Sequence, residues 1–263
     1  MPACRRQAGT WHPVTGEDFL MGSGLEDIRI PDDGDAPNKR ALVVAAHPDD
    51  SEFGCAGTAA LWARDGWEVY YLICTDGSKG SEDPEMTPQK LVPLRREEQR
   101  AAARVLGVKD VFFLDYVDGE LTYTREFARD VVRAIRTIRP NTVFTSDSNQ
   151  IVRNTFINHP DHRCAGMVAL DCVYPLARNR PSFPELLDEG LEPHSAKEVF
   201  LWSTNEVNYK VDISAVIDLK LEALRQHASQ MVGMEMRLDQ IRSFWRDEDG
   251  RYMENFRRIP IPF

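Results

Sequence analysis

The sequence predicts an α/β fold, in which helices cover both faces of a Rossmann-like, mostly parallel sheet. Strand-sized apolar runs alternate with segments of helical composition, as a parallel sheet with crossover helices requires. Two helical segments are followed by glycine, which commonly ends helices. Right-handed crossovers favour this layout, and ligands then bind outside the carboxyl ends of the strands.

Five apolar segments have the length and composition of strands. The first, 41–46, is continuously apolar and ends just before Pro48, as expected of a strand that is buried on both faces of a parallel sheet. The second is rich in Tyr, Val and Ile, which favour extended backbone. The predicted strands are 41–46, 68–74, 111–114, 142–145 and 199–202.

The predicted helices lie between and after these strands. The clearest is 94–106, which is dense in Arg, Glu, Gln and Ala and ends at Gly107. Segment 125–138 repeats apolar residues near helical spacing. A proline-rich segment, 178–194, is predicted as a long, lid-like loop. The predicted helices are 56–65, 94–106, 125–138, 161–174, 213–231 and 235–245.

The composition is that of a globular protein, with 42% hydrophobic and 28% charged residues among 263. Residues 39–263 are predicted as a single domain. Residues 1–38 are predicted as an N-terminal arm, because Gly, Pro and Asp are frequent there and no periodicity is present.

Charge, cysteines and hydropathy restrict the partners and the compartment. The net charge of −10 disfavours a nucleic-acid partner. No apolar run approaches the roughly 18 residues of a membrane span, and no secretory signal is visible, so we expect no membrane partner. The five cysteines form no C-x-x-C pair, which predicts neither a disulfide framework nor a cysteine zinc site. We therefore expect a cytoplasmic protein.

Two short motifs rich in histidine and aspartate follow predicted strands. The first, His-Pro-Asp-Asp at 47–50, comes directly after the first strand, and the second, His-Pro-Asp-His at 159–162, comes after the fourth. Pro160 fits the first turn of a helix, which places His159 at the helix start and His162 one turn later. Because the carboxyl ends of parallel strands share one edge of the sheet, we expect the two motifs to meet there.

The side chains of these motifs suit a metal ion with catalytic groups beside it. Imidazole and carboxylate ligands suit zinc or ferrous iron, and three ligands leave one position open for water. We expect His47, Asp50 and His162 to be the ligands. Asp49 and His159 then lie beside the metal, where one takes a proton from water and the other stabilises the oxyanion or protonates the leaving group. Taken singly, each motif fits a structural turn or helix cap equally well.

The same motifs resemble those of the PIG-L/LmbE family of metal-dependent N-deacetylases. Residues 47–50, followed by Gly57 and Thr58, are similar to the first family motif, and residues 159–163 to the second. The resemblance extends over about residues 40–231. The other similar stretches are Thr75-Asp76-Gly77 with Gly80, Arg95-x-x-Glu98 with Leu106-Gly107, and Lys220-x-x-Ala223-x-x-x-His227-x-Ser229-Gln230.

This resemblance implies a Rossmann-like fold and zinc-dependent hydrolysis of N-acetyl groups, usually on glucosamine-type sugars. It makes Asp49 the general base and His159 the electrophilic or acid group, with Asp161 orienting His159. One position departs from some relatives that act on mycothiol precursors: they carry Tyr two residues before the second motif, where this chain has Ile157. The metal ligands that the resemblance implies are His47, Asp50 and His162.

Three polar residues predicted near the strand ends are expected to bind substrate. The resemblance makes Arg95 and Asp118 candidates for contacts to sugar hydroxyls, and Arg153 is predicted in the same region. For each of these three residues, a role as a solvated surface charge or in a structural salt bridge explains its presence equally well.

The predicted function is metal-dependent removal of an N-acetyl group from an N-acetylglucosamine-type sugar or conjugate, with Zn²⁺ or Fe²⁺ as the cofactor. Two alternatives are a non-catalytic sugar- or nucleotide-binding module and a metallophosphoesterase. The latter is weaker, because a two-metal site needs more ligands than can be placed. The expected partner is a small amino-sugar, and aromatic residues in the arm and tail also allow a homo-oligomer.

Overall fold

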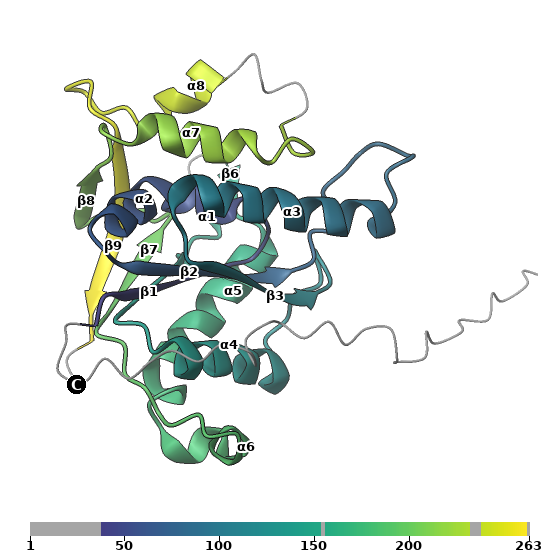
Figure 1. Cartoon of the computed structure of the whole chain (residues 1–263), viewed down its shortest axis with the longest axis vertical. Coiled ribbons are helices and arrows are strands. Elements are labelled where there is room, and N and C mark those ends of the chain that lie inside the picture. Colours follow the sequence, from purple (N-terminus) through teal and green to yellow (C-terminus); the bar gives the residue numbers. More distant parts are fainter. Residues whose placement is uncertain (1–37, 154–155, 232–237, 262–263) are drawn as a thin grey trace, which may run out of the picture.

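A central sheet carries the fold in the computed structural model, which describes residues 38–153, 156–231 and 238–261 (Figure 1). Its strand order is β3-β2-β1-β4-β7-β9-β8, and β9 runs antiparallel to both of its neighbours. A separate hairpin pairs β5 (Val152–Arg153) with β6 (Phe156–Ile157). The sheet strands are β1 (Arg40–Ala45), β2 (Glu68–Thr75), β3 (Asp110–Tyr116), β4 (Thr142–Ser146), β7 (Glu198–Trp202), β8 (Tyr209–Asp212) and β9 (Met253–Pro260).

Helices cover both faces of this sheet (Figure 1). The upper face carries α1 (Asp50–Gly54), α2 (Ala56–Arg64), α3 (Pro88–Leu106), α7 (Ile217–Arg225) and α8 (Leu238–Ser243). The lower face carries α4 (Arg125–Ile138), α5 (Pro160–Asp171) and α6 (Pro184–Asp188). Among the described residues, no helix combines the length and the hydropathy of a membrane span. The predicted Rossmann-like α/β fold is confirmed.

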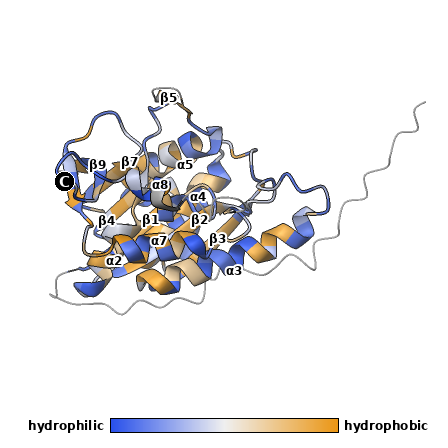
Figure 2. Cartoon of the chain, turned by 90° about the horizontal axis from the view of Figure 1, so that it is seen from above, coloured by the Kyte–Doolittle hydropathy of each residue, from blue (hydrophilic) through white to orange (hydrophobic). Residues whose placement is uncertain are grey.

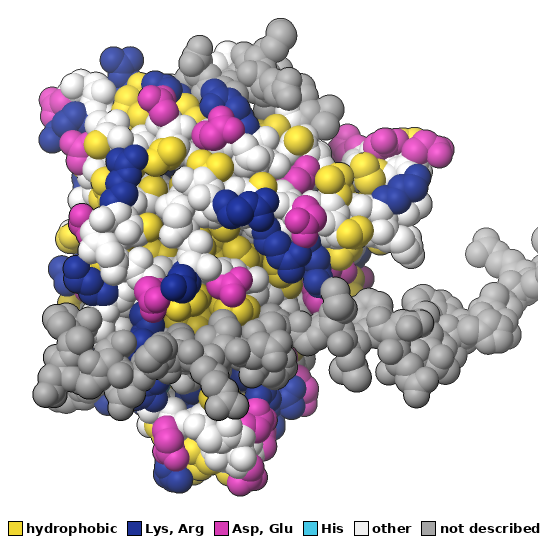
Figure 3. Space-filling model, viewed as in Figure 1, with side chains coloured by type: hydrophobic (Ala, Val, Ile, Leu, Met, Phe, Trp, Pro, Cys, Tyr) yellow, Lys and Arg dark blue, Asp and Glu magenta, His cyan; other side chains and the backbone are white. Residues whose placement is uncertain are grey.

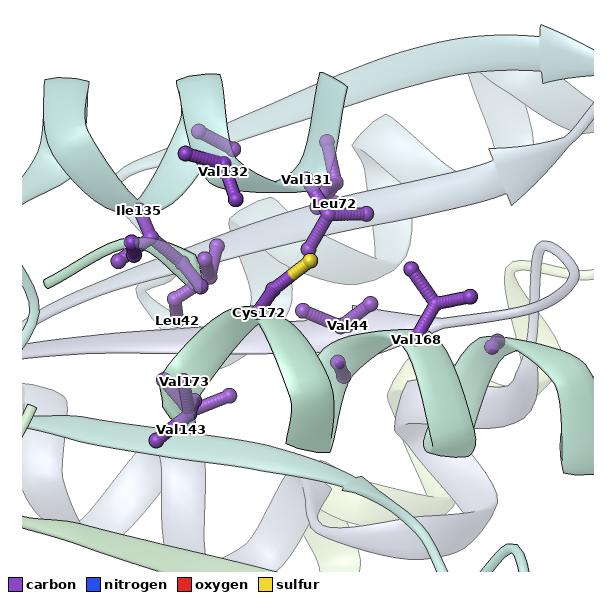
Figure 4. Packing of buried hydrophobic residues seen from close by; sticks show 14 of the residues in the cluster. Leu42, Val44, Leu72, Val131, Val132, Ile135, Val143, Val168, Cys172 and Val173 are labelled. Carbon is purple, nitrogen blue, oxygen red and sulfur yellow. The ribbon is translucent and has the colours of Figure 1, made fainter. Parts of the chain in front are cut away.

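The core has two layers, one on each face of the sheet. Successive strand side chains point to opposite faces, so Leu42 and Val44 pack against α4 and α5, while Val43 packs against α2 and α7. Figure 4 shows Val131 and Val168 meeting the strand residues in the lower layer. Figure 2 accordingly shows apolar strands between helices whose outward faces are hydrophilic. This two-sided burial explains the continuously apolar first strand.

The second half of the chain differs from the prediction. The predicted helix at 213–231 is wrong in extent, because α7 covers only Ile217–Arg225. The predicted helix at 235–245 contains the shorter α8, and 232–237 lie outside the described residues. Strands β8 and β9 were not predicted, because charged residues interrupt their apolar pattern. The predicted arm also lies outside the described residues, except for Asn38.

Segment 178–194, predicted as a loop, contains the short helix α6 and lies at the amino end of the sheet. Nε2 of His194 donates to the carbonyl oxygen of Pro140, two residues before β4, at 2.7 Å. The buried guanidinium of Arg136 in α4 donates to the carbonyl oxygens of Ala177 and Asn179, both at 3.1 Å. The prediction of a lid is therefore wrong, because ligands of this fold bind at the opposite, carboxyl edge.

A buried ion pair joins the last strand to the first helices. Nζ of Lys220 lies 2.5 Å from Oε1 of Glu254, and both side chains are fully buried. The Glu254 carboxylate also accepts hydrogen bonds from the backbone amides of Gly57 and Thr58, at 2.8 and 2.7 Å. It thus caps the N-terminus of α2, where anions are favoured. Lys220 in turn donates to the carbonyl oxygen of Phe53 in α1 at 3.0 Å.

Figure 3 shows acidic and basic side chains intermixed on one face of the molecule. Exposed ion pairs of this kind, such as Arg225 with Glu222, contribute little to stability. The exposed pair of Arg225 and Glu222 therefore serves as a control for the buried pair of Lys220 and Glu254.

We expect Glu254→Gln to lower the free energy of unfolding by about 3–5 kcal/mol, because it leaves Lys220 charged and buried without an anion. Urea unfolding followed by circular dichroism measures this loss. The control Glu222→Gln removes an exposed partner and should cost no more than about 1 kcal/mol. Equal losses in the two variants would contradict the structural role of Glu254.

His194 predicts a dependence of stability on pH. Burial lowers its pKa to about 4, against a hydrogen bond to Pro140 that raises it. The pKa of histidine in the unfolded chain is about 6.5, so His194 stabilises the fold above pH 6.5, and this contribution is lost as the pH falls toward 4. Between pH 6.5 and 4.5 the wild type should lose about 1–2 kcal/mol more unfolding free energy than His194→Gln, which keeps an N–H donor but does not titrate. Parallel curves in urea unfolding would refute this assignment.

Candidate active site

The first motif leaves the carboxyl end of β1 in a tight turn. Asp49 adopts a left-handed backbone conformation, with φ 97° and ψ −26°, immediately before α1 begins at Asp50. This conformation is uncommon for a residue other than glycine and persists only where the surroundings hold it. The backbone amide of Asp49 donates to Oε1 of Gln99 in α3 at 2.9 Å. The turn directs the neighbouring carboxylates of Asp49 and Asp50 to different partners.

The second motif forms the start of α5, as predicted. Pro160 occupies the first turn, and Nδ1 of His159 caps the helix by accepting from the backbone amide of Asp161 at 3.2 Å. His162 follows within the first turn. A Cβ atom at Gly166 would lie 2.2 Å from the carbonyl oxygen of Ser146, so glycine allows α5 to approach the end of β4 closely.

The three predicted ligands meet in one cluster. Nδ1 of His47 lies 3.2 Å from Nε2 of His162 and 3.5 Å from Oδ2 of Asp50, and Nε2 of His162 lies 3.0 Å from Oδ1 of Asp50. Two ligand atoms on a tetrahedral zinc ion are about 3.3 Å apart, given metal–ligand distances of about 2.0–2.1 Å. The cluster therefore fits a zinc-sized ion.

In each imidazole of the cluster, the second nitrogen has a polar partner that fixes the orientation of the ring. Nδ1 of His162 donates to Oδ1 of Asn158 at 3.1 Å, which leaves Nε2 directed at the cluster. Nε2 of His47 lies 3.1 Å from Oδ1 of Asp118 and 3.2 Å from Oδ2 of Asp161. Histidines that bind metals almost always donate their second N–H to such groups.

Two other groups of side chains can also hold an ion. One combines the rings of His47, His159 and His162, and the other combines His47 with Asp118 and Asp161. All of the candidate groups share His47. Both nitrogens of this ring face candidate ligands: Nδ1 faces His162 and Asp50, and Nε2 faces Asp118 and Asp161.

The electrostatics of the cluster favour a cation. Burial lowers the pKa of His47, but hydrogen bonds to Asp118, Asp161 and Asp50 outweigh it and raise the pKa to about 12. Burial raises the pKa of Asp50, but the adjacent His162 and His47 hold it well below its ordinary value. Several carboxylates thus remain ionised in a largely buried space, and buried charge must be compensated by a partner or a metal.

The comparisons with known proteins agree with the motifs. The family profile described as "PIG-L: GlcNAc-PI de-N-acetylase" matches residues 42–173, half of the chain. The chain belongs to the PIG-L family. Both His-Asp motifs of the candidate site lie inside the matched residues.

Three proteins that are similar to this chain are informative. Diacetylchitobiose deacetylase of Thermococcus kodakarensis is 38% identical over 250 residues, which cover 92% of this chain and 88% of the relative. The solved structure of N,N'-diacetylchitobiose deacetylase from Pyrococcus horikoshii gives a TM-score of 0.76 at 36% identity and covers 84% of each chain. A probable N-acetyl-alpha-D-glucosaminyl L-malate deacetylase 2 of Bacillus anthracis is 26% identical, covering 73% of this chain and 81% of the relative.

The structure differs in detail from the prediction that Asp161 orients His159. The carboxylate of Asp161 faces His47 and accepts from the backbone amides of Gly119 and Leu121, at 2.7 and 3.2 Å. The hydrogen bond from Asp161 to His159 comes from the backbone amide of Asp161. His159 thus receives its hydrogen bond from the helix start, and Asp161 positions the His47 imidazole.

The predicted substrate contacts have partners within the protein. Arg95 is 3% exposed, and its guanidinium donates to Oδ2 of Asp49 at 3.2 Å and to the carbonyl oxygens of Pro48 and Gly77. Asp118 is also buried and lies against His47. The structure places both as supports of the site. Arg153 lies in β5, but its side chain lies outside the described part of the chain.

A buried chain of side chains behind Asp49 was not predicted. Nε2 of Gln99 donates to Oε1 of Glu52 at 3.0 Å, and Oε2 of Glu52 lies 3.2 Å from Nε2 of His227. His227 belongs to the C-terminal stretch that resembles the family, which was the one available signal. These side-chain contacts join α1, α3 and the end of α7 behind the turn that carries Asp49.

Proposed function

We propose that this chain is a zinc-dependent amidohydrolase that removes the N-acetyl group from an N-acetylglucosamine-type sugar. The observation that carries this proposal is the position of Asp49, whose carboxylate and backbone are held by Arg95 and Gln99 next to the cluster of His47, Asp50 and His162. The named activities of the relatives, which include deacetylation of diacetylchitobiose, support the choice of reaction and substrate.

In the proposed site, His47, Asp50 and His162 hold the metal, and their two imidazoles and one carboxylate suit zinc. When bound, zinc supplies Lewis-acid polarisation and lowers the pKa of water. Burial, opposed by Arg95, raises the pKa of Asp49 to about 6. A carboxylate of this basicity takes the proton from the attacking water and returns it to the departing amine.

His159 stabilises the oxyanion in this proposal. Its Nδ1 accepts a hydrogen bond from the backbone amide of Asp161, so the proton of the neutral ring is on Nε2. That N–H can donate to the developing oxyanion of the acetamide. The mechanism uses no cysteine nucleophile, because burial raises the pKa of Cys55 well above its ordinary value and keeps the thiol protonated.

We expect Asp49→Asn to lower kcat at least about 100-fold on N-acetylglucosamine substrates while metal content stays unchanged, because the variant lacks the general base. Fluorescent labelling of the released amine measures turnover, and elemental analysis measures the metal. A non-catalytic binding module would be indifferent to the change. Retained turnover would eliminate Asp49 as the base.

Metal removal tests the ligand assignment. A chelator should abolish amine release, and added Zn²⁺ should restore it. His162→Ala should reduce bound zinc well below one ion per chain, whereas His194→Gln, which lies at the opposite end of the sheet, should bind zinc normally. Full activity after chelation would overturn the metal-dependent mechanism, and phosphate release from p-nitrophenyl phosphate would favour the phosphoesterase alternative.

A further inference from the structure

The backbone of Asp49 is held on both sides of its Cα atom. Its amide donates to Oε1 of Gln99 in α3 at 2.9 Å, and its carbonyl oxygen accepts from the backbone amides of Glu52 and Phe53, at 3.0 and 3.1 Å. The carbonyl contacts belong to the start of α1, whereas the contact to the amide comes from another helix. The left-handed conformation of Asp49, with φ 97°, therefore relies on Gln99 for a contact that the short helix does not supply.

The carboxylate of Glu52 fixes which way the side-chain amide of Gln99 faces. Nε2 of Gln99 donates to Oε1 of Glu52 at 3.0 Å. In the reversed orientation, the amide oxygen of Gln99 would face this carboxylate, and its NH₂ group would face the backbone N–H of Asp49. Both contacts would then be repulsive, so Oε1 of Gln99 stays directed at Asp49.

His227 in turn holds Glu52 from the side of α7. Its Nε2 lies 3.2 Å from Oε2 of Glu52, and both side chains are fully buried. Gln99 is fully buried as well. Among the described residues, Nδ1 of His227 has no hydrogen-bond partner. Because buried polar groups cost free energy when any of them is unpaired, stability alone does not explain why three polar side chains fill this space.

Arg95 reaches Asp49 by a separate route. It donates to Oδ2 of Asp49 at 3.2 Å and to the carbonyl oxygen of Pro48 at 2.6 Å, so it binds the end of the Asp49 side chain. Gln99 binds the backbone, which sets the direction in which that side chain leaves the turn. A shift of this backbone would move the Asp49 carboxylate relative to Asp50, the next residue in the chain.

We propose that Gln99 is a positioning residue for the general base, and that Glu52 and His227 act through it by fixing the orientation of its amide. The inference rests on the proposed function, in which Asp49 takes a proton from the attacking water. A general base must lie within hydrogen-bond reach of the proton that it removes. Loss of the Gln99 contact therefore lowers the rate of hydrolysis more than it weakens substrate binding.

An exchange of two side chains tests the proposal. Gln99→Glu places a second carboxylate against that of Glu52, whereas Glu52→Gln keeps an oxygen atom that can accept from Gln99. In the double variant, the carboxylate at position 99 accepts from the Asp49 amide and from the amide at position 52, whose oxygen accepts from His227. Every donor of the wild type thus keeps an acceptor in the double variant.

We expect Gln99→Glu to lower kcat for N,N'-diacetylchitobiose about 10- to 100-fold, while KM stays within about 3-fold of the wild type and zinc content is unchanged. Glu52→Gln should lower kcat less, by about 3- to 10-fold, because it introduces no second charge. The double variant should be at least about 5-fold faster than Gln99→Glu. Losses that simply add in the double variant would overturn the proposal.

Glu98→Gln is the matched control. Glu98 precedes Gln99 in α3 and is also buried, but its carboxylate accepts from the backbone amide and the hydroxyl of Ser229, at 2.7 and 2.6 Å. Within the described part of the chain, the hydrogen bonds of Glu98 do not reach Asp49. The variant should lower stability while kcat stays within about 2-fold of the wild type. A loss of kcat as large as that of Gln99→Glu would show that any disturbance of α3 slows the reaction.

Hydrogen exchange at the Asp49 amide separates this inference from the proposed function. Gln99→Met removes both hydrogen bonds of the Gln99 side chain but keeps an unbranched side chain of similar size. In NMR measurements the Asp49 amide should exchange at least about 10-fold faster in this variant than in the wild type, whether or not the wild type hydrolyses the sugar. Unchanged exchange would refute the hold of Gln99 on the backbone.

The two readouts together assign each failure. Faster exchange with wild-type kcat in Gln99→Met would overturn the positioning role but keep Asp49 as the base. If the zinc-loaded wild type released no amine from N,N'-diacetylchitobiose, while Gln99→Met still accelerated exchange, the proposed reaction and the catalytic part of this inference would both be overturned. The hold of Gln99 on the Asp49 backbone would then stand by itself.

Discussion

The imidazole of His47 stands among the carboxylates of Asp50, Asp118 and Asp161, and the rest of the site depends on this concentration of buried negative charge. Charges of one sign are not stable together in a poorly solvated space without compensation. The fold brings these carboxylates together from three segments, namely the ends of β1 and β3 and the start of α5. No single segment therefore holds all of the charges. A divalent cation is the compensation that fits the distances, and the same field explains why the guanidinium of Arg95 is buried beside Asp49.

The sequence was most informative where one local pattern determines one local structure. Apolar runs predicted the parallel strands, and Pro160 predicted the helix that separates His159 from His162 by one turn. Long-range polar contacts were beyond such patterns. Gln99, Glu52 and Asn158 support the site through partners far away in the chain, and an isolated Gln or Asn carries no periodic signal. The composition of the proline-rich segment 178–194 indicated a loop, but neither the short helix α6 within it nor the end of the sheet at which the segment lies.

The site and the adjoining cavity draw on different parts of the chain. The cluster and Asp49 lie within residues 42–173, which match the PIG-L profile. A cavity of about 500 Å³ beside Asn158 is lined largely by later residues, including Trp202, Phe244 and Trp245.

The cap that Glu254 places on α2 has a consequence for biosynthesis. The two contact segments are 197 residues apart, and ribosomes make the chain from its N-terminus. While translation proceeds, α2 therefore lacks its anionic cap, and Lys220 has no buried counter-ion until the final strand emerges. Contacts this distant in sequence are also slow to form, because a long loop must close first. The anionic cap of α2 and the counter-ion of Lys220 thus form only after the segment that carries Glu254 has been made, and a chain without that segment would lack both.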